Sequence, residues 1–158
     1  MSPVWSVMTW VAALGSGLIA GTFFAFSAFV MAALARLPKS EGIAAMQSIN
    51  RTAVRPPLMA VLFGTAAVGL GLAVWAAINL AEDSAWWILG GSALYLLGCI
   101  AVTIVCNVPM NEALAKLNPG DPAAAGQWAH YVSVWTAWNT VRGLAALGAA
   151  ALFIVALV

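Results

Sequence analysis

All six cationic side chains of this chain fall on one side of a four-span membrane arrangement. Four of the six lie between the first and second stretches: Arg36, Lys39, Arg51 and Arg55. The other two, Lys116 and Arg142, lie between the third stretch and the body of the fourth. The linker between the second and third stretches holds only the acidic Glu82 and Asp83. Because basic residues in short loops stay on the cytoplasmic side, this pattern predicts four membrane spans with both termini outside.

The composition is that of a protein embedded in a lipid bilayer. Hydrophobic residues make up 64% of the chain and charged residues 7%, whereas soluble domains have roughly 25% charged residues. The net charge of +1 argues against nucleic acid as a partner, because phosphate binding needs a strongly basic surface. The length predicts one integral membrane domain, 1–158, expected in a plasma membrane such as the bacterial inner membrane. The first 35 residues carry no charge, so we expect a retained span and not a cleaved signal peptide.

Hydropathy and turn residues set the expected limits of the helices. About 20 apolar residues cross the hydrocarbon core of a bilayer. Spans are expected at about 5–34, 57–80, 86–108 and 135–158, with interfacial segments at about 40–54 and 109–118. Since the connections are short, the predicted fold is all-α: an antiparallel four-helix transmembrane bundle with short interfacial helices on the cytoplasmic side.

Small residues recur at spacings typical of helix contacts in membranes, where they let backbones approach closely. They are Gly17 and Gly21 with Ala25, Ala67 with Gly71, and Gly143 with Gly148. These faces can pack within the chain or against another copy, so a homo-oligomer is one expectation. Cys99 and Cys106 are separated by two helical turns, about 10 Å, which is too far for a disulfide. With a single histidine in the chain, we expect no metal site.

Polar and aromatic residues gather at one depth of the predicted bundle. On the fourth helix they follow one another at spacings of three or four, which places them on one face: Trp128, Tyr131, Trp135, Asn139 and Arg142. On the third helix Thr103, Asn107 and, if the helix continues through Pro109, Asn111 form a second stripe that Tyr95 and Cys99 extend outward. We expect the two stripes to face each other around a pocket that opens to the cytoplasm.

Each of these residues also has a purely structural interpretation. Arg142 either extends to the interface or pairs with Glu112, because an unpaired charge in hydrocarbon is costly. Asn107 either belongs to a site or satisfies carbonyls freed by Pro109, and Asn139 either belongs to a site or joins two helices. The aromatic stripe also fits an interface belt. Asn50 and Arg51 also fit simple contacts with the membrane surface, and His130 lies off the main stripe.

Four segments carry a family resemblance. The segment 107–111, Asn-Val-Pro-Met-Asn, followed by Leu114, resembles the N-x-P-x-N signature of the anthrone oxygenase-like family of small four-helix membrane proteins. The segment 135–142 resembles the W-x-x-W-N-x-x-R stretch of the same family, and segments 17–27 and 46–50 also fit. Fungal members oxidise anthrones to anthraquinones, and many bacterial relatives have no assigned activity.

The resemblance implies a group of site residues: Asn50, Asn107, Asn111, Trp135, Asn139 and Arg142. It implies an oxygenase that acts on an apolar aromatic small molecule or another enolisable compound and needs no cofactor, since an anthrone enolate can itself reduce dioxygen. Asn107, Asn139 and Arg142 are then expected to stabilise the enolate, with Glu112 as the favoured base and Tyr95 or His130 as alternatives. The expected substrate contacts are Asn50, Asn111, Trp135, Trp138, Tyr131 and Thr103.

Two other functions remain open on the sequence alone. The same pocket suits a binding or transport module for an apolar solute, although the expected outer half of the bundle is almost purely apolar. The small-residue faces suit a scaffold that assembles with other membrane proteins. Turnover of an anthrone by the purified protein separates the enzyme from both.

Overall fold

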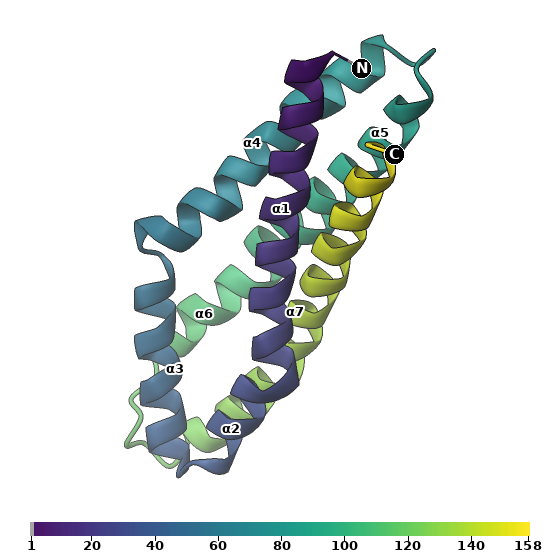
Figure 1. The fold of residues 1–158 in the computed structure, drawn as a ribbon. Coiled ribbons are helices and arrows are strands. Elements are labelled where there is room, and N and C mark those ends of the chain that lie inside the picture. Colours follow the sequence, from purple (N-terminus) through teal and green to yellow (C-terminus); the bar gives the residue numbers. More distant parts are fainter. Residues whose placement is uncertain (1) are drawn as a thin grey trace.

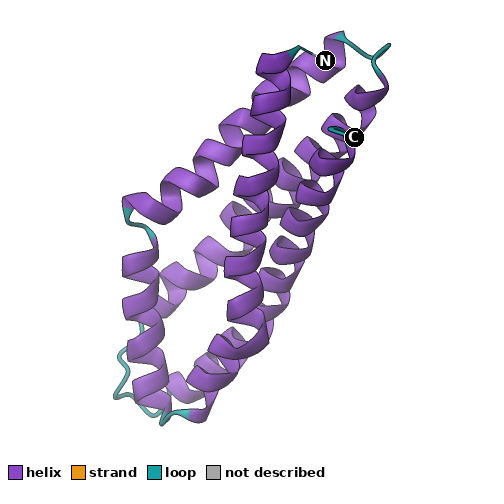
Figure 2. Cartoon of the chain, in the orientation of Figure 1, coloured by secondary structure: helices purple, strands orange, loops and turns teal. Residues whose placement is uncertain are grey.

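The computed structural model describes residues 2–158, which form helices joined by short loops (Figures 1 and 2). In chain order the elements are α1 (Pro3–Ala25), η1 (Phe26–Val30), α2 (Met31–Arg36), α3 (Lys39–Ala53), α4 (Pro56–Ile78), α5 (Asp83–Ala93), η2 (Leu94–Ala101), η3 (Thr103–Asn107), α6 (Val108–Ala115) and α7 (Ala124–Val155). The segments η1, η2 and η3 are π-helical turns inside longer helices.

Four continuous helices are long and apolar enough to cross a membrane: Pro3–Arg36, Pro56–Ile78, Asp83–Ala115 and Ala124–Val155. The first packs against α4 and α7, and α5 packs against the same two helices. Both termini lie at the same end of the bundle as the α4–α5 loop (Figure 1). The chain is therefore a multi-pass membrane protein, and the expected all-α four-helix bundle is confirmed.

The third long helix does not stop near residue 108 but continues to Ala115. Pro109 lies in the first turn of α6, directly after the π-helical turn η3. In that turn the Val108 amide donates to the carbonyl of Thr103, five residues earlier. A widened turn and a proline are two of the usual causes of a helix bend. The helix therefore absorbs the proline, and Asn111 remains on the same long helix as Thr103.

The helix α3 lies along one side of the bundle and meets α4 at a bend (Figure 1). It packs against α2, α6 and α7 through buried Gly42, Ile43 and Met46. A Cβ at Gly42 would lie 2.8 Å from the carbonyl oxygen of Leu34, so only glycine allows this approach. Gln47 Nε2 donates to the carbonyls of residues 114 and 117, at 2.9 and 3.0 Å, where the end of α6 leaves carbonyls without helical partners.

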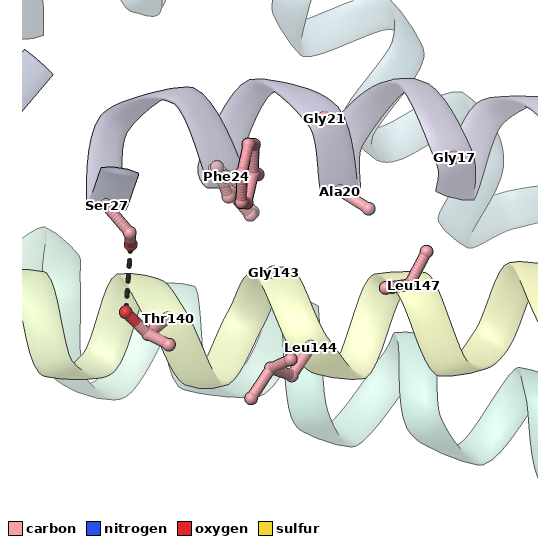
Figure 3. Close-up of a pocket in the computed structure, with 10 residues that line it drawn as sticks. Gly17, Ala20, Gly21, Phe24, Ser27, Thr140, Gly143, Leu144 and Leu147 are labelled. Atoms are coloured by element: carbon pink, nitrogen blue, oxygen red, sulfur yellow. Dashed lines mark hydrogen bonds between the residues drawn. The ribbon is translucent and has the colours of Figure 1, made fainter. Parts of the chain in front are cut away.

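The predicted small-residue faces have different outcomes. Gly143 and Gly148 lie against neighbouring helices, since a Cβ at these positions would be 3.4 Å from Phe23 and 3.0 Å from Leu94. By contrast, a Cβ at Gly17 or Gly21 would have no described atom within 4 Å. Those two glycines line an open groove of about 360 Å³ between α1 and α7, where Ser27 and Thr140 are hydrogen-bonded (Figure 3). Assembly with another copy stays a prediction.

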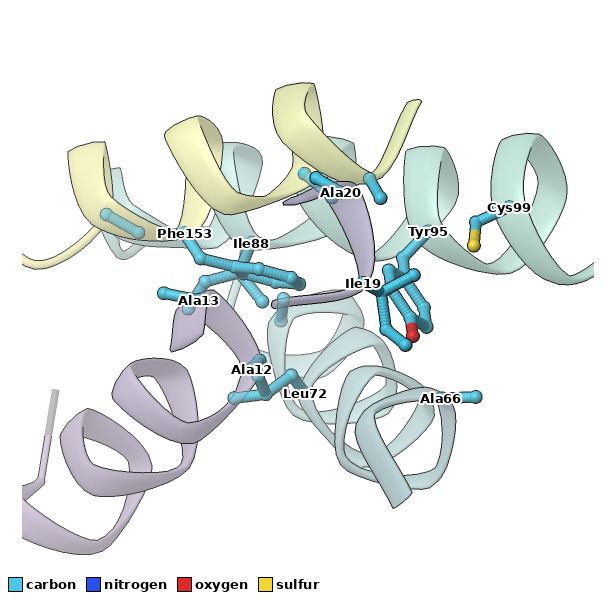
Figure 4. Packing of buried hydrophobic residues seen from close by; sticks show 14 of the residues in the cluster. Ala12, Ala13, Ile19, Ala20, Ala66, Leu72, Ile88, Tyr95, Cys99 and Phe153 are labelled. Atoms are coloured by element: carbon cyan, nitrogen blue, oxygen red, sulfur yellow. The ribbon is translucent and has the colours of Figure 1, made fainter. Parts of the chain in front are cut away.

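Two clusters of buried residues form the interior. The terminal core, at the end that holds both termini, includes Ala12, Ile19, Leu72, Ile88 and Phe153 (Figure 4). The aromatic core lies toward the other end and consists of Met31, Leu34, Ile43, Met46, Leu114, Ala124, Trp128, Tyr131 and Trp135. The predicted stripe of α7 begins in the aromatic core with Trp128 and ends at the boundary between the two clusters with Arg142.

Candidate functional site

One face of α7 carries the predicted stripe into the interior. Trp128, Tyr131, Trp135, Asn139 and Arg142 are all at most 5% exposed. Trp128 and Tyr131 stack with ring centroids 5.8 Å apart, and Tyr131 and Trp135 stack at 5.9 Å. The shared face that helical spacing predicted is confirmed, and it is a stacked aromatic wall and not an interface belt.

The Arg142 guanidinium lies inside the protein, where it contacts only neutral groups among the described residues. Its Nη1 donates to Thr103 Oγ1 at 3.2 Å and its Nη2 donates to Asn139 Oδ1 at 2.8 Å. Its Cζ lies 4.1 Å from the centroid of the Phe23 ring and 5.5 Å from that of Trp135, within the range of cation–π attraction. Its buried Nε has no hydrogen-bond partner among residues 2–158.

Asn139 ties α7 to the first long helix. Its Nδ2 donates to the carbonyl of Phe23 at 2.7 Å and to Ser27 Oγ at 2.8 Å. Ser27 belongs to the π-helical turn η1. The amide therefore joins two helices with its nitrogen while its oxygen holds Arg142. The two interpretations of Asn139, interhelical contact and site residue, are compatible.

Asn107 joins the third long helix to α7. Its side chain is fully buried, and its Nδ2 donates to the backbone carbonyl of Trp135 at 3.3 Å. The alternative that Asn107 satisfies a carbonyl freed by Pro109 is therefore wrong, because the amide donates to another helix. Its Oδ1 has no partner in the described part of the chain.

Asn111 and Asn50 complete a polar network around the aromatic wall. Asn111 Oδ1 accepts hydrogen bonds from the Tyr131 hydroxyl and from Trp135 Nε1, both at 2.8 Å. Asn50, on α3, donates to the same hydroxyl at 3.4 Å. These contacts fix the orientation of both rings. They also bring together residues of α3, α6 and α7. The family resemblance had named these residues as site residues but had not predicted which of them are in contact.

A cavity of about 180 Å³ lies beside this network. Most of its lining is apolar and comes from α1, η1, α3 and α4 as well as from the third and fourth long helices. The polar residues that line it are Thr22, Asn50, Thr103, Asn111, Asn139 and Arg142, and Trp135 forms part of its wall. The expected residues of the third and fourth spans do line one cavity, and the sequence did not predict that α3 and α4 close its other side.

A second cavity, of about 720 Å³, does lie between the third long helix and α7. It is lined by Cys106, His130, Tyr131 and Trp138 among others. Trp138 is 39% exposed. Tyr131 and Trp138 thus line this second cavity, whereas the other predicted substrate contacts, Asn50, Thr103, Asn111 and Trp135, line the first.

Glu112 does not pair with Arg142. The Glu112 carboxylate is exposed. Among the described residues Arg142 forms no ion pair, and its side chain donates hydrogen bonds to Thr103 and Asn139. Glu112 follows Asn111 directly, and one helical residue turns the side chain by about 100°, onto the outer face of α6. Arg142 does not extend to the interface either, since it is 5% exposed.

The other two candidate bases also lie away from the cavity beside Arg142. The Tyr95 hydroxyl is buried in the terminal core and donates to the carbonyl of Leu62 at 3.1 Å. His130 is exposed and lines the second cavity. None of the three predicted bases is among the residues that line the cavity with Arg142.

The sequence reasoning gave Phe23 and Ser27 no role in the site. Their contacts with Asn139 join residues 116 and 112 positions apart in the chain. The available signals were the hydroxyl of Ser27 in a mainly apolar stretch and the place of Ser27 in the segment 17–27 that carries the resemblance. The π-helical turn that directs it toward α7 has no recognisable sequence pattern of its own.

Comparison with known proteins places this geometry in a family. The family model described as anthrone oxygenase matches residues 57–152, which is more than half of the chain. No curated protein and no solved structure matches. The matched region includes the third and fourth long helices with Asn107, Asn111, Trp135, Asn139 and Arg142. The chain therefore belongs to the anthrone oxygenase family.

Proposed function

We propose that the chain is a membrane oxygenase that oxidises an anthrone or a similar enolisable aromatic ketone in the cavity beside Arg142. The observation that carries this proposal is the buried guanidinium at the edge of an apolar cavity. The apolar lining suits a flat hydrocarbon body, and a few convergent polar groups suit the recognition of one oxygen atom. Family membership supplies the reaction class.

The reaction balances with dioxygen as the only oxidant. Loss of a proton from the methylene carbon gives an enolate, which passes electrons to dioxygen and forms a carbon–oxygen bond. Return of a proton gives a hydroperoxide at that carbon. The hydroperoxide then loses water as its O–O bond and the remaining C–H bond break, which leaves the new carbonyl of the quinone.

Arg142 is the proposed catalytic residue. A guanidinium held at the cavity stabilises the negative charge of the enolate oxygen, and a pre-oriented cation does so without reorganisation during the reaction. Asn139 acts as a positioning residue, because its Oδ1 holds Nη2 of Arg142 at 2.8 Å. Thr103 holds the other terminal nitrogen. Trp135 provides a flat wall, and Asn50 and Asn111 provide polar contacts at the end of the cavity near α3.

The direct test is oxygen consumption by the protein in detergent, after treatment with a chelator, with an anthrone as substrate. We expect a rate above that of spontaneous oxidation. Arg142→Met should lower kcat by about 10²- to 10³-fold, as loss of a charge-stabilising donor does elsewhere, and should change KM less. Arg36→Met is the matched control, because Arg36 is exposed at the end of α2. A wild-type rate equal to the spontaneous rate, or activity only after a metal or flavin is added, would contradict the proposal.

The proposed orientation places α3 and the end of α6 on the cytoplasmic side, which puts the cavity in the cytoplasmic half of the bilayer. The argument is the distribution of basic residues between the linkers. Single cysteines at Lys39, Lys116 or Asp83, in a variant without Cys99 and Cys106, test it with a membrane-impermeant thiol reagent. Positions 39 and 116 should react only from the cytoplasm and position 83 only from outside. Labelling of position 83 from the cytoplasm would reverse the orientation.

A further inference from the structure

The positive charge of Arg142 has no counter-ion within the described chain. Arginine stays protonated in proteins, and this side chain is 5% exposed. All five carboxylate side chains of the protein are exposed: Glu41, Glu82, Asp83, Glu112 and Asp121. A buried charge without a partner is strongly unfavourable. The buried Nε, which has no partner among residues 2–158, is a further unsatisfied donor on the same group.

The other polar side chains at the cavity are neutral, and two of them, Asn50 and Asn111, have amide donors. The Thr103 hydroxyl and the Asn139 amide nitrogen already donate within the protein. Asn111 Oδ1 already accepts two hydrogen bonds, from Tyr131 and Trp135, so its amide nitrogen is the group left to meet a ligand. Asn50 likewise donates through its Nδ2. A cavity with one uncompensated cation and amide donors favours an acceptor with negative charge.

The cavity also has no carboxylate or imidazole in its lining. Glu112 and His130 are exposed elsewhere, and the Tyr95 hydroxyl is hydrogen-bonded to Leu62 in the terminal core. A carbon acid that enters this cavity as the neutral ketone would therefore meet a stabilising cation but no group suited to take its proton.

We propose that the site binds its ligand as a preformed monoanion, so that the protein selects the ionised form of a planar, lipid-soluble weak acid and does not itself remove the proton. The anionic oxygen lies at Arg142, and the aromatic body lies against Trp135 and the apolar lining. The ligand class is that of acids whose negative charge is delocalised over a ring system, such as enolates of anthrones and phenolates of hydroxyquinones. This inference rests on the proposed function for the place of the ligand, but it concerns binding and not oxidation.

The test uses 2-hydroxyanthraquinone, a planar phenol that does not react with oxygen and changes colour when it ionises. Its pKa is measured by absorbance in empty detergent micelles and in micelles with excess protein. Wild type should lower the pKa of the bound phenol by about 1 to 3, the effect of one nearby opposite charge. The phenolate should then bind about 10- to 1000-fold more tightly than the phenol.

Variants assign the effect to one charge. Arg142→Met should abolish the lowered pKa, Arg142→Lys should retain part of it, and Arg36→Met should leave it intact. Anthraquinone itself, which has no ionisable group, should bind equally to wild type and to Arg142→Met, which shows that the variant keeps its cavity. Failure of the phenol to bind to wild type, an unchanged pKa, or an equally lowered pKa with Arg142→Met would each overturn the proposal.

A kinetic measurement separates this inference from the oxidation itself. If substituted anthrones are turned over, the pH dependence of kcat/KM should follow the pKa of each substrate, and a single pH dependence shared by all of them would indicate a protein base and overturn the inference. If no anthrone is oxidised but the phenol pKa is lowered, the proposed oxidation fails and the anion site stands.

Discussion

The two halves of the bundle use opposite ways of packing helices. In the terminal core the buried side chains are mainly alanine and aliphatic, and hydroxyls make its hydrogen bonds, as Thr9 does with the carbonyl of Trp5 at 2.8 Å and Tyr95 with that of Leu62 at 3.1 Å. In the aromatic half, amides bond other helices, as Asn139 does with Phe23 and Asn107 with Trp135. Close contact of small residues brings the helix backbones together. Large rings and crossing amides hold the helices apart and enclose a cavity.

This difference matters in a bilayer, where hydrophobicity does not drive helices together and packing and hydrogen bonds do. The terminal core supplies stability by close contact, and the other half can then retain a buried cation and a cavity. The comparison predicts that substitutions in the first half change stability alone, whereas substitutions in the second change activity as well.

The largest expected effect comes from removing one large ring in each half. Phe153→Ala and Trp135→Ala should each destabilise the protein by about 3 to 5 kcal/mol, as truncation of a buried ring does. Only Trp135→Ala should also lower oxygen consumption per folded molecule, because Trp135 lines the cavity. Unfolding in mixed micelles measures the first quantity, and Trp86→Ala, at an exposed position, is the control. If both variants lose activity equally, the prediction that only the aromatic half affects activity is wrong.

The next effect concerns the amide that joins α7 to α1. Asn139→Ala should cost about 1 to 3 kcal/mol, because it leaves Arg142 Nη2 without its partner and removes the bonds from α7 to the Phe23 carbonyl and Ser27. It should also lower kcat, since Arg142 loses the group that orients it. The double variant Asn139→Ala with Arg142→Met tests the cause of this loss. If it regains stability but not activity, the loss came from the positive charge that Asn139→Ala leaves without a partner. If Asn139→Ala leaves stability unchanged, the hydrogen bonds of this amide to α1 do not stabilise the aromatic half.

Two glycine-to-alanine substitutions, each of which adds one methyl group, test how closely the helices pack. A Cβ at Gly98 would lie 2.5 Å from the Cβ of Ala145, so Gly98→Ala should force the backbones apart and destabilise by about 1 to 3 kcal/mol. Gly17→Ala meets no described atom within 4 Å and should stabilise by up to about 1 kcal/mol through helix propensity. Thermal unfolding in detergent tests the opposite signs. A destabilising Gly17→Ala would indicate that the groove between α1 and α7 is occupied in the assembled protein.

The smallest expected effect lies at a hydroxyl of the terminal half. Ser92 is buried, and its Oγ has no hydrogen-bond partner among the described residues. Ser92→Ala should therefore be neutral or stabilising by about 1 kcal/mol, because it removes an unsatisfied polar group. The same unfolding measurement checks it. A clear loss of stability would mean that this hydroxyl has a partner in the membrane.

The sequence predicted those features that depend on spacing along one helix. Apolar length and charge placement gave four spans, and the period of 3.6 residues gave the shared face of Trp135, Asn139 and Arg142. The sequence did not predict contacts between segments that lie far apart in the chain. Asn50 meets Tyr131 across 81 positions, and this contact exists because α3 runs along the side of the bundle. The pairing of Arg142 with Glu112 was wrong, because depth, helical phase and the cost of an isolated charge did not give the direction in which α6 turns each side chain.

The π-helical turns have a consequence for how such a protein can change. Each one adds a residue to a helical turn, so it resets which side chains face inward beyond that point. In the third long helix η2 and η3 lie between the terminal-core residue Ile88 and Asn111 beside the cavity. Gain or loss of one residue there would rotate one half of a helix by about 100° relative to the other. Related chains can therefore acquire a new set of ligand contacts in a single step while the sequence that anchors them in the bilayer stays the same.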